Sequence, residues 1–379
     1  MKKVSIFTSL VLSIFISGCS LIEPNTPIND KENLKLEKNR DYLATVSRKN
    51  ELHIVDSTTN KLYKTCNLQG SYMSGGLIIS PKGDTAYILQ DNWGAVYGYD
   101  LNSCENTFIA KFSQESNVRE MSIFSFTLSP DGKKLYTISN PTQMLNDRYK
   151  VMDSVFKVFN TNDGLDAKPI DSFKAPRQIT IMSTADDGTV YAAGSNIYKI
   201  DLEKKEFTIA AKLRNWDRAN YSSPDTLAMW PIGNISKEFL LMYTAAKFPN
   251  DKMNIDEAQF VWGATRVDLK TNEIVQEDFA PLEYVMFTGM THPKDSNILY
   301  GVLTDLTKFD RKNQKVLKRV WLDRTYYCIN FATDGSKIYL GGTFNDIAVY
   351  NPDTLEKITK ITLPDGDVGA GTLQVFQVK

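Results

Sequence analysis

The sequence has 379 residues, 42% of them apolar, so the chain can bury a substantial core. Its 44 basic and 45 acidic residues give a net charge of −1, without the positive surplus that nucleic-acid binding requires. Only two histidines are present, His53 and His292, so a metal site built from several histidines has almost no candidates.

The N-terminus is typical of an exported bacterial lipoprotein. Two lysines precede an apolar run over residues 4–16, which has the length of a secretory signal and is shorter than the roughly 20 residues that span a bilayer. The run ends in Ile-Ser-Gly-Cys, which resembles a lipobox, in which Cys19 is lipidated and becomes the new N-terminus. An ordinary signal peptide that happens to contain a cysteine is the alternative.

These features divide the start of the chain into two segments. Residues 1–18 are predicted to be the lipoprotein signal peptide, and residues 19–40, polar and containing two prolines, a lipidated flexible tether. Cys19 is followed by serine and not by the aspartate that resembles an inner-membrane retention signal. We therefore expect the protein to lie in the periplasm, anchored to a membrane by the lipid on Cys19.

Three cysteines remain after lipidation, and an odd number cannot pair completely. Cys66 and Cys104 can form a disulfide, but the sequence alone leaves this open. Cys328 lies in an apolar strand pattern and is expected to be a small core residue. No C-x-x-C-H motif occurs, so no covalently attached haem is expected in this chain.

An internal repeat predicts the fold. Its most recognisable unit is a strand that ends in an aromatic or aliphatic residue followed by Asp or Asn, then a polar turn and a returning strand. The residues that mark the unit are Val55, Tyr99, Phe159, Ile200, Val267, Phe309 and Tyr350. Their spacings are 44, 60, 41, 67, 42 and 41 residues, so four of the six match one propeller blade and two imply insertions.

A second unit precedes the first in most copies. It consists of two apolar strands joined by a Pro/Asp-Gly turn, as in FTLSPDGKKLYTI at 126–138, and the glycine tolerates the positive φ that such turns demand. Together the units give four strands per copy, which predicts an all-β, seven-bladed β-propeller over residues 41–379. The strands 372–378 and 42–48 are expected to complete one shared blade. An open solenoid or two sandwiches are the alternatives.

Side chains at the start of each blade's first strand could form a site, because these positions surround one mouth of the central channel. They are mostly aromatic: Tyr72, Phe124, Gln178, Asp225, Trp230, Tyr284, Phe287, Tyr326 and Tyr327. The insertions, at about 140–154 and 244–260, are expected on the same face. Exposed aromatic groups on a rigid scaffold are typical of protein interfaces, although such residues can also simply pack between blades. No nucleophile–base set or phosphate loop is visible, so the residues indicate a binding module.

Several stretches resemble one family in order and spacing: FKAPRQITIMSTADDGTVYAAG at 173–194, YSSPDTLAMW at 221–230, EYVMFTGMTHP at 283–293, and the run from RTYYCINFATDG to ITLP at 324–364. This family is the β subunit of quinohaemoprotein amine dehydrogenase, a YVTN-like propeller, and the likeness spans essentially the whole propeller. The Asp-Gly hairpins are common to propellers, whereas the APRQIT and Y-x-x-P-D-x-L-A-x-W strings are more specific.

The resemblance implies a heterotrimeric periplasmic oxidoreductase that converts primary amines to aldehyde and ammonia. In such an enzyme a small γ subunit carries cysteine tryptophylquinone, an α subunit carries two c-type haems, and the β subunit has no cofactor or catalytic residue of its own. The β subunit walls the substrate pocket and holds the γ subunit. By motif, the candidates for the wall or the subunit contact are Gln178, Asp225, Trp230, Phe287, Tyr326 and Tyr327. The alternatives are an envelope lipoprotein scaffold without enzymatic role and a stand-alone propeller hydrolase, which the missing metal ligands disfavour.

Overall fold

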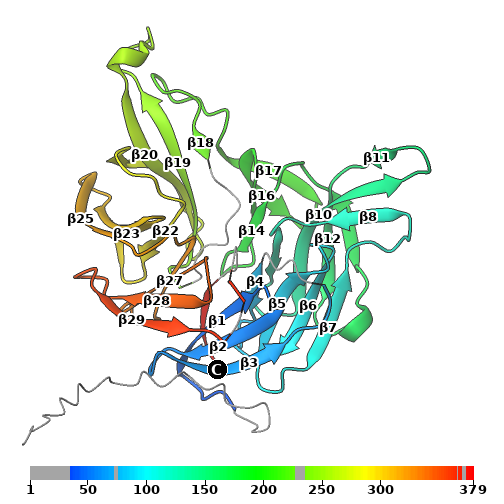
Figure 1. Cartoon of the computed structure of the whole chain (residues 1–379). Helices are drawn as coiled ribbons and strands as arrows, with labels where there is room; N and C mark the ends of the chain where they lie inside the picture. Colours follow the sequence, from blue (N-terminus) through cyan, green and yellow to red (C-terminus); the bar gives the residue numbers. More distant parts are fainter. Residues whose placement is uncertain (1–34, 72–75, 227–234, 365, 369–372) are drawn as a thin grey trace, which may run out of the picture.

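The computed structural model describes residues 35–379 except 72–75, 227–234, 365 and 369–372. Its strands form seven separate antiparallel sheets that follow one another around a ring (Figure 1). Six of the sheets have four strands, and the third sheet has two more. This confirms the predicted all-β, seven-bladed propeller.

The strands of each blade run outward from the channel in a regular order. The innermost strands contact one another around the ring, as between β9 and β14, β22 and β26, and β30 and β4. Blade 1 consists of β30 (Gln374–Gln377), β1 (Asp41–Ser47), β2 (Glu51–Asp56) and β3 (Lys61–Asn67). Blade 2 consists of β4 (Leu77–Ile79), β5 (Thr85–Gln90), β6 (Ala95–Asp100) and β7 (Asn106–Lys111). Blade 3 consists of β9 (Phe126–Leu128), β10 (Lys134–Met144), β12 (Val155–Asn160) and β13 (Asp171–Lys174), with the additional strands β8 (Val118–Met121) and β11 (Tyr149–Val151) and the 3-10 turn η1 (Gly164–Asp166).

The remaining four blades repeat this order. Blade 4 consists of β14 (Ile181–Thr184), β15 (Val190–Ala193), β16 (Asn196–Asp201) and β17 (Glu206–Lys212). Blade 5 consists of β18 (Asp225–Thr226), β19 (Glu238–Lys247), β20 (Gln259–Asp268) and β21 (Ile274–Pro281), with the 3-10 turn η2 (Ile255–Glu257). Blade 6 consists of β22 (Thr288–His292), β23 (Asp295–Val302), β24 (Asp305–Asp310) and β25 (Lys315–Trp321), and blade 7 of β26 (Cys328–Phe331), β27 (Ile338–Gly341), β28 (Asp346–Tyr350) and β29 (Lys357–Thr362).

The repeat read from the sequence corresponds to one structural position. All seven marker residues, from Val55 to Tyr350, lie at or next to the end of the third strand of a blade and are buried. The Asp or Asn that follows accepts backbone hydrogen bonds from the turn, as Asp100 does from the N–H groups of Asn102 and Ser103 at 2.9 and 2.7 Å. The motif therefore pairs a core side chain with an oxygen acceptor that closes the turn.

These turns also share their backbone conformation. The residue five positions after each marker has positive φ in all seven blades: Asn60, Cys104, Gly164, Lys205, Asn272, Gln314 and Leu355. Only one of them is glycine, so the turn geometry overrides the steric cost of a left-handed backbone at the other six.

The two ends of the chain close the ring in blade 1. β30 pairs with β1 in antiparallel register from Asp41↔Gln377 to Ala44↔Gln374, so the innermost strand of the first blade comes from the C-terminus. The predicted shared blade is confirmed for the residues described; Thr372, where the returning strand was expected to begin, lies outside them.

The propeller body begins earlier than residue 41. Leu36 is buried in the core of blades 1 and 2, and its N–H donates to Asn102 Oδ1 at 2.9 Å. Lys38 forms a bridge with Val378, and Arg40 pairs with Asp56 at 2.5 Å. Residues 35–40 of the expected tether are therefore part of the folded body, because one apolar side chain and several polar contacts fix them to it.

The structure shows which of the described cysteines form a disulfide, a question that the sequence left open. Cys66, in β3, forms a disulfide with Cys104, in the turn after β6, with their Cα atoms 5.4 Å apart. The bond joins blades 1 and 2. Cys328 is buried in β26 and takes no part in it, as expected of a core residue, and burial raises the pKa of its thiol to about 12.

His53 should make the stability of the propeller depend on pH. It is fully buried in β2, and burial lowers its pKa to about 4. Between pH 6.5 and 4 the unfolded chain binds a proton that the folded chain does not, so stability falls by about 2 kcal/mol as pH decreases. The Glu51 carboxylate, 3.6 Å from Nε2, opposes part of this loss.

Urea titrations from pH 7.5 to 4.5 would measure the effect. The control variant His53→Gln keeps a side chain that can bond to Thr65, whose Oγ1 lies 3.0 Å from Nδ1 of His53. We expect the variant to lose less stability than the parent over this range. An identical pH dependence in the two proteins would contradict the assignment.

Candidate functional site

The connections between strands form two different faces. Antiparallel strands reverse direction at each turn, so the links between blades and the turns from second to third strand share one face, called here the insertion face. The other turns form the turn face. Both insertions are on the insertion face as predicted: β10 extends to Met144 and is followed by β11, and β19 and β20 form a long hairpin around η2 (Figure 1).

Exposed apolar side chains gather on the insertion face. Most of the large apolar residues that are exposed in the described chain belong to its insertions and links: Met144, Tyr149, Val151, Met152, Met253, Ile255, Phe260, Val285, Trp321 and Phe344. The others lie on outer strands or, as Leu165 and Ile170, near the turn face. Exposed apolar side chains that gather on one face of a soluble protein are typical of interaction sites.

An arginine packs against two aromatic rings at the end of blade 6. The guanidinium of Arg319 lies 3.9 Å from the ring centre of Tyr284 and 4.5 Å from that of Trp321. Its charge is balanced by Asp305, at 2.6 Å. Trp321 is nevertheless 74% exposed, so a large ring is held in a defined position but left without cover.

A similar arrangement occurs in the neighbouring blade. Arg324 lies 4.7 Å from the ring centre of Tyr326 and 5.1 Å from that of Phe344, and its Nη1 donates to Asp346 at 2.9 Å. Phe344 is 62% exposed and has a φ of 61°. A left-handed backbone is costly for phenylalanine, so the turn presents this ring to solvent at the expense of local strain.

The structure separates the residues that the sequence had grouped. Phe287 and Tyr327 come together, with ring centres 4.9 Å apart. Gln178 and Asp225 are exposed in blades 4 and 5; Gln178 accepts a hydrogen bond from Ser195 at 2.7 Å, and Asp225 pairs with the extended part of β19. Tyr326 is fully buried, and its hydroxyl donates to Asp323 at 2.9 Å.

Three candidates cannot be placed. They are Tyr72, Trp230 and the lipidation candidate Cys19, which lie outside the described residues. The more prominent residues of the face, Trp321 and Phe344, were not among the candidates, because only the starts of first strands were considered. The sequence signal that would have identified them is an aromatic residue at the end of a blade's fourth strand, or in the short turn between its second and third strands.

A buried carboxylate fixes the base of the β19–β20 hairpin. Asp278 accepts two hydrogen bonds from Arg218, at 2.9 and 3.2 Å, and one each from Tyr221 and Tyr243, at 2.5 and 2.7 Å. Burial opposes ionisation, but these donors lower the pKa of Asp278. Burial and the bond to Asp278 raise the pKa of Tyr221 to about 12. The network therefore attaches the segment before blade 5 to its sheet.

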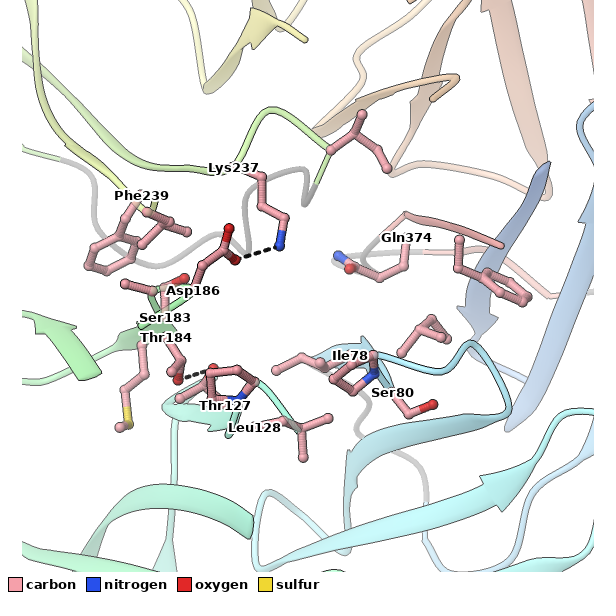
Figure 2. A pocket seen from close by; sticks show the side chains of 18 of the residues that line it. Ile78, Ser80, Thr127, Leu128, Ser183, Thr184, Asp186, Lys237, Phe239 and Gln374 are labelled. Atoms are coloured by element: carbon pink, nitrogen blue, oxygen red, sulfur yellow. Dashed lines mark hydrogen bonds and ion pairs between the residues drawn. The ribbon is translucent and has the colours of Figure 1, made fainter. Parts of the chain in front are cut away.

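The central channel contains a cavity of about 660 Å³. Its wall combines aliphatic and hydroxyl side chains of the innermost strands (Figure 2). Polar groups pair with each other across blades: Asp186 with Lys237 at 3.0 Å, and Thr127 with Thr184 at 3.1 Å. Of the described candidate residues from the sequence, only Phe124, just before β9, lines this cavity.

The described part of the chain has neither a cluster of metal ligands nor a membrane-spanning helix. No group of three or more His, Cys, Asp or Glu residues there could hold a metal ion. No helix in the same part is long and apolar enough to cross a membrane.

Comparisons with known proteins bear on the fold alone. The sequence matches no protein-family model, and no curated protein sequence matches it. Among solved structures, it is similar to Kuenenia stuttgartiensis hydrazine synthase (TM-score 0.50, 15% identity, 83% of this chain and 90% of that one). It is also similar to the dihydro-haem d1 dehydrogenase NirN (0.50, 13%, 94% and 77%) and to a functionally unknown protein from Desulfotomaculum acetoxidans (0.56, 9%, 89% and 99%).

Proposed function

We propose that this chain is the non-redox β subunit of a periplasmic quinohaemoprotein amine dehydrogenase. Its insertion face would hold the small quinone-bearing γ subunit and close one side of the pocket in which primary amines are oxidised to aldehyde and ammonia. The quinone, cysteine tryptophylquinone, would supply the redox chemistry from the γ subunit, and haem c on the α subunit would remove the electrons.

The observation that carries the proposal is the uncovered aromatic surface of blades 6 and 7. Trp321 and Phe344 are rigidly backed by Arg319 and Arg324, and aromatic and arginine side chains dominate the binding energy of protein interfaces. The neighbouring Phe287–Tyr327 pair lies among the stretches that resemble the family. An apolar wall of this kind also excludes water from a reactive carbonyl group.

The disulfide is consistent with the proposed location. The bond between Cys66 and Cys104 requires an oxidising compartment, such as the periplasm, in most bacteria. Together with the lipobox at Cys19, it supports an exported, lipid-anchored subunit. Palmitate labelling of the full chain and of a Cys19→Ala variant would test the anchor, because only the parent should incorporate label.

Purification of the tagged full-length protein from its native envelope tests the function. We expect a small subunit with a crosslink-shifted mass and a subunit with a dihaem c-type spectrum, whose haems become reduced when n-butylamine is added. A protein that elutes colourless, or with envelope-assembly partners only, would replace the proposal with a propeller scaffold that binds through the same face.

Trp321→Ala should separate partner binding from stability. Removing an exposed, rigidly held ring from an interface is expected to weaken binding about 30-fold, which corresponds to about 2 kcal/mol. The melting temperature should change little, because the ring is not part of the core. Leu165→Ala, at an exposed residue near the turn face, is the control and should bind like the parent protein in surface plasmon resonance. Equal affinities of the two variants would contradict the assigned face.

A further inference from the structure

The insertion of blade 3 builds a small sheet that extends beyond the ring. The outer half of β10 pairs with β8 on one side, from Asn140↔Met121 to Gln143↔Val118, and with β11 on the other. A buried ion pair between Glu120 and Lys157, at 2.7 Å, fixes its base. β11 is the terminal strand of this sheet, so one edge of it pairs with no described strand.

The register shows which backbone groups lie on that open edge. Met152 N–H donates to Pro141 O at 3.1 Å, and Leu145 N–H donates to Arg148 O at 2.9 Å, on either side of β11. Hydrogen-bonded pairs alternate in an antiparallel ladder, so Lys150 also bonds toward β10. The N–H and C=O groups of the two remaining residues, Tyr149 and Val151, therefore point away from the sheet.

The side chains of these two residues are also exposed to solvent. Tyr149 is 75% exposed and Val151 is 65% exposed. Met144, the cross-strand partner of Tyr149, is exposed on the same side of the sheet. The edge therefore offers two unused donor–acceptor pairs together with an apolar strip.

The charges around β11 restrict what can pair with it. Asp147 pairs with Arg148 at 2.8 Å, and Asp153 pairs with Lys174 at 3.0 Å, so the charges that flank the strand are balanced. Lys150, between the two outward-facing residues, forms no ion pair with any residue that the structure describes. A second copy that paired antiparallel around this position would place one Lys150 opposite the other, which is destabilising.

We propose that β11 receives an extended segment of a partner polypeptide as an added strand. The segment would carry an acidic residue opposite Lys150, with apolar residues on either side of it that contact Tyr149 and Val151. Strand addition of this kind takes its affinity from main-chain hydrogen bonds and its specificity from alternate side chains. The three-residue length admits one short segment and limits further sheet growth. The inference rests on the proposed role of the insertion face in holding a protein partner.

Hydrogen exchange in the full-length chain tests the inference. The probe is an acetylated, amidated peptide, Thr-Thr-Val-Glu-Val-Thr-Thr, and its counterpart has lysine in place of glutamate. At millimolar concentration, the glutamate peptide is expected to slow exchange of the Tyr149 and Val151 amides at least 5-fold, with a smaller effect at high salt. The lysine peptide should have little effect. Absence of protection at both amides, or equal protection by both peptides, would overturn the proposal.

Two variants distinguish strand pairing from apolar adhesion. Val151→Pro removes an outward N–H but none of the bonds between β10 and β11, and proline is tolerated at such edge positions. Val151→Ala removes most of the side chain and keeps the N–H. The proline variant should lose peptide binding at Tyr149 while the Met152 amide stays protected, and the alanine variant should bind at most 5-fold more weakly. Retention of binding in the proline variant would refute strand addition.

This test is independent of the native-envelope purification. If the peptide protects the Tyr149 and Val151 amides but no subunit co-purifies, strand addition at β11 is supported and the dehydrogenase assignment is contradicted. If a dehydrogenase complex is purified but its Tyr149 and Val151 amides exchange as fast as in the isolated chain, strand addition at β11 is contradicted. The dehydrogenase assignment then stands.

Discussion

Removal of residues 374–379 should abolish cooperative folding of the propeller. These residues contain β30, the innermost strand of blade 1, which pairs with β1 over four residues. Val375 and Phe376 are buried in the cores on the two sides of this blade. Their loss exposes both cores, and it also removes the only strand that carries the C-terminal end of the described chain back into the first blade. A ring with an unpaired edge is then left open to association.

Circular dichroism during thermal and urea unfolding would measure this effect. We expect no cooperative transition in the truncated chain, whereas removal of Lys379 alone should leave the transition unchanged. Phe376→Ala provides a graded case, because a buried phenylalanine truncated to alanine costs about 3–5 kcal/mol. A truncated protein that melts within a few degrees of the parent would show that the ring does not depend on this closure.

Lys157→Ala should destabilise the protein by about 3–5 kcal/mol, because it leaves the carboxylate of Glu120 buried without a counter-ion. In the parent protein Lys157 donates to Glu120 at 2.8 Å and to the carbonyl of Phe112 at 2.6 Å. Ser139 donates to the same carboxylate at 2.5 Å. The cost should appear in urea unfolding at neutral pH.

Two further variants make the result specific. The double variant Lys157→Met with Glu120→Leu should be close to the parent in stability, because apolar residues of similar size can replace a buried ion pair. Lys168→Ala breaks the exposed pair between Lys168 and Asp166 and should cost less than about 1 kcal/mol. Equal costs for Lys157→Ala and Lys168→Ala would mean that burial does not determine the energy of the ion pair.

The aromatic candidates show where sequence reasoning about the site succeeded and where it failed. The repeat placed the starts of the first strands on one face, but it could not say which rings are covered. Tyr326 and Tyr327 are adjacent, yet the first is fully buried and the second is only partly so. Both residues lie in the link just before β26, and Tyr326 is covered because it packs against Met290 and Tyr300 of the neighbouring blade, which the local sequence does not show.

The sequence by itself determined the architecture, because each blade repeats the same local chemistry. A marker side chain, an Asp or Asn acceptor and a tight turn recur seven times, and each depends only on residues close together in the chain. Only the tertiary structure decided the packing of residues 35–40, the pairing of Cys66 with Cys104, and the exposure of Trp321, Phe344 and β11. These features depend on contacts between blades far apart in sequence, and on the absence of a described strand beside β11, which no local pattern encodes.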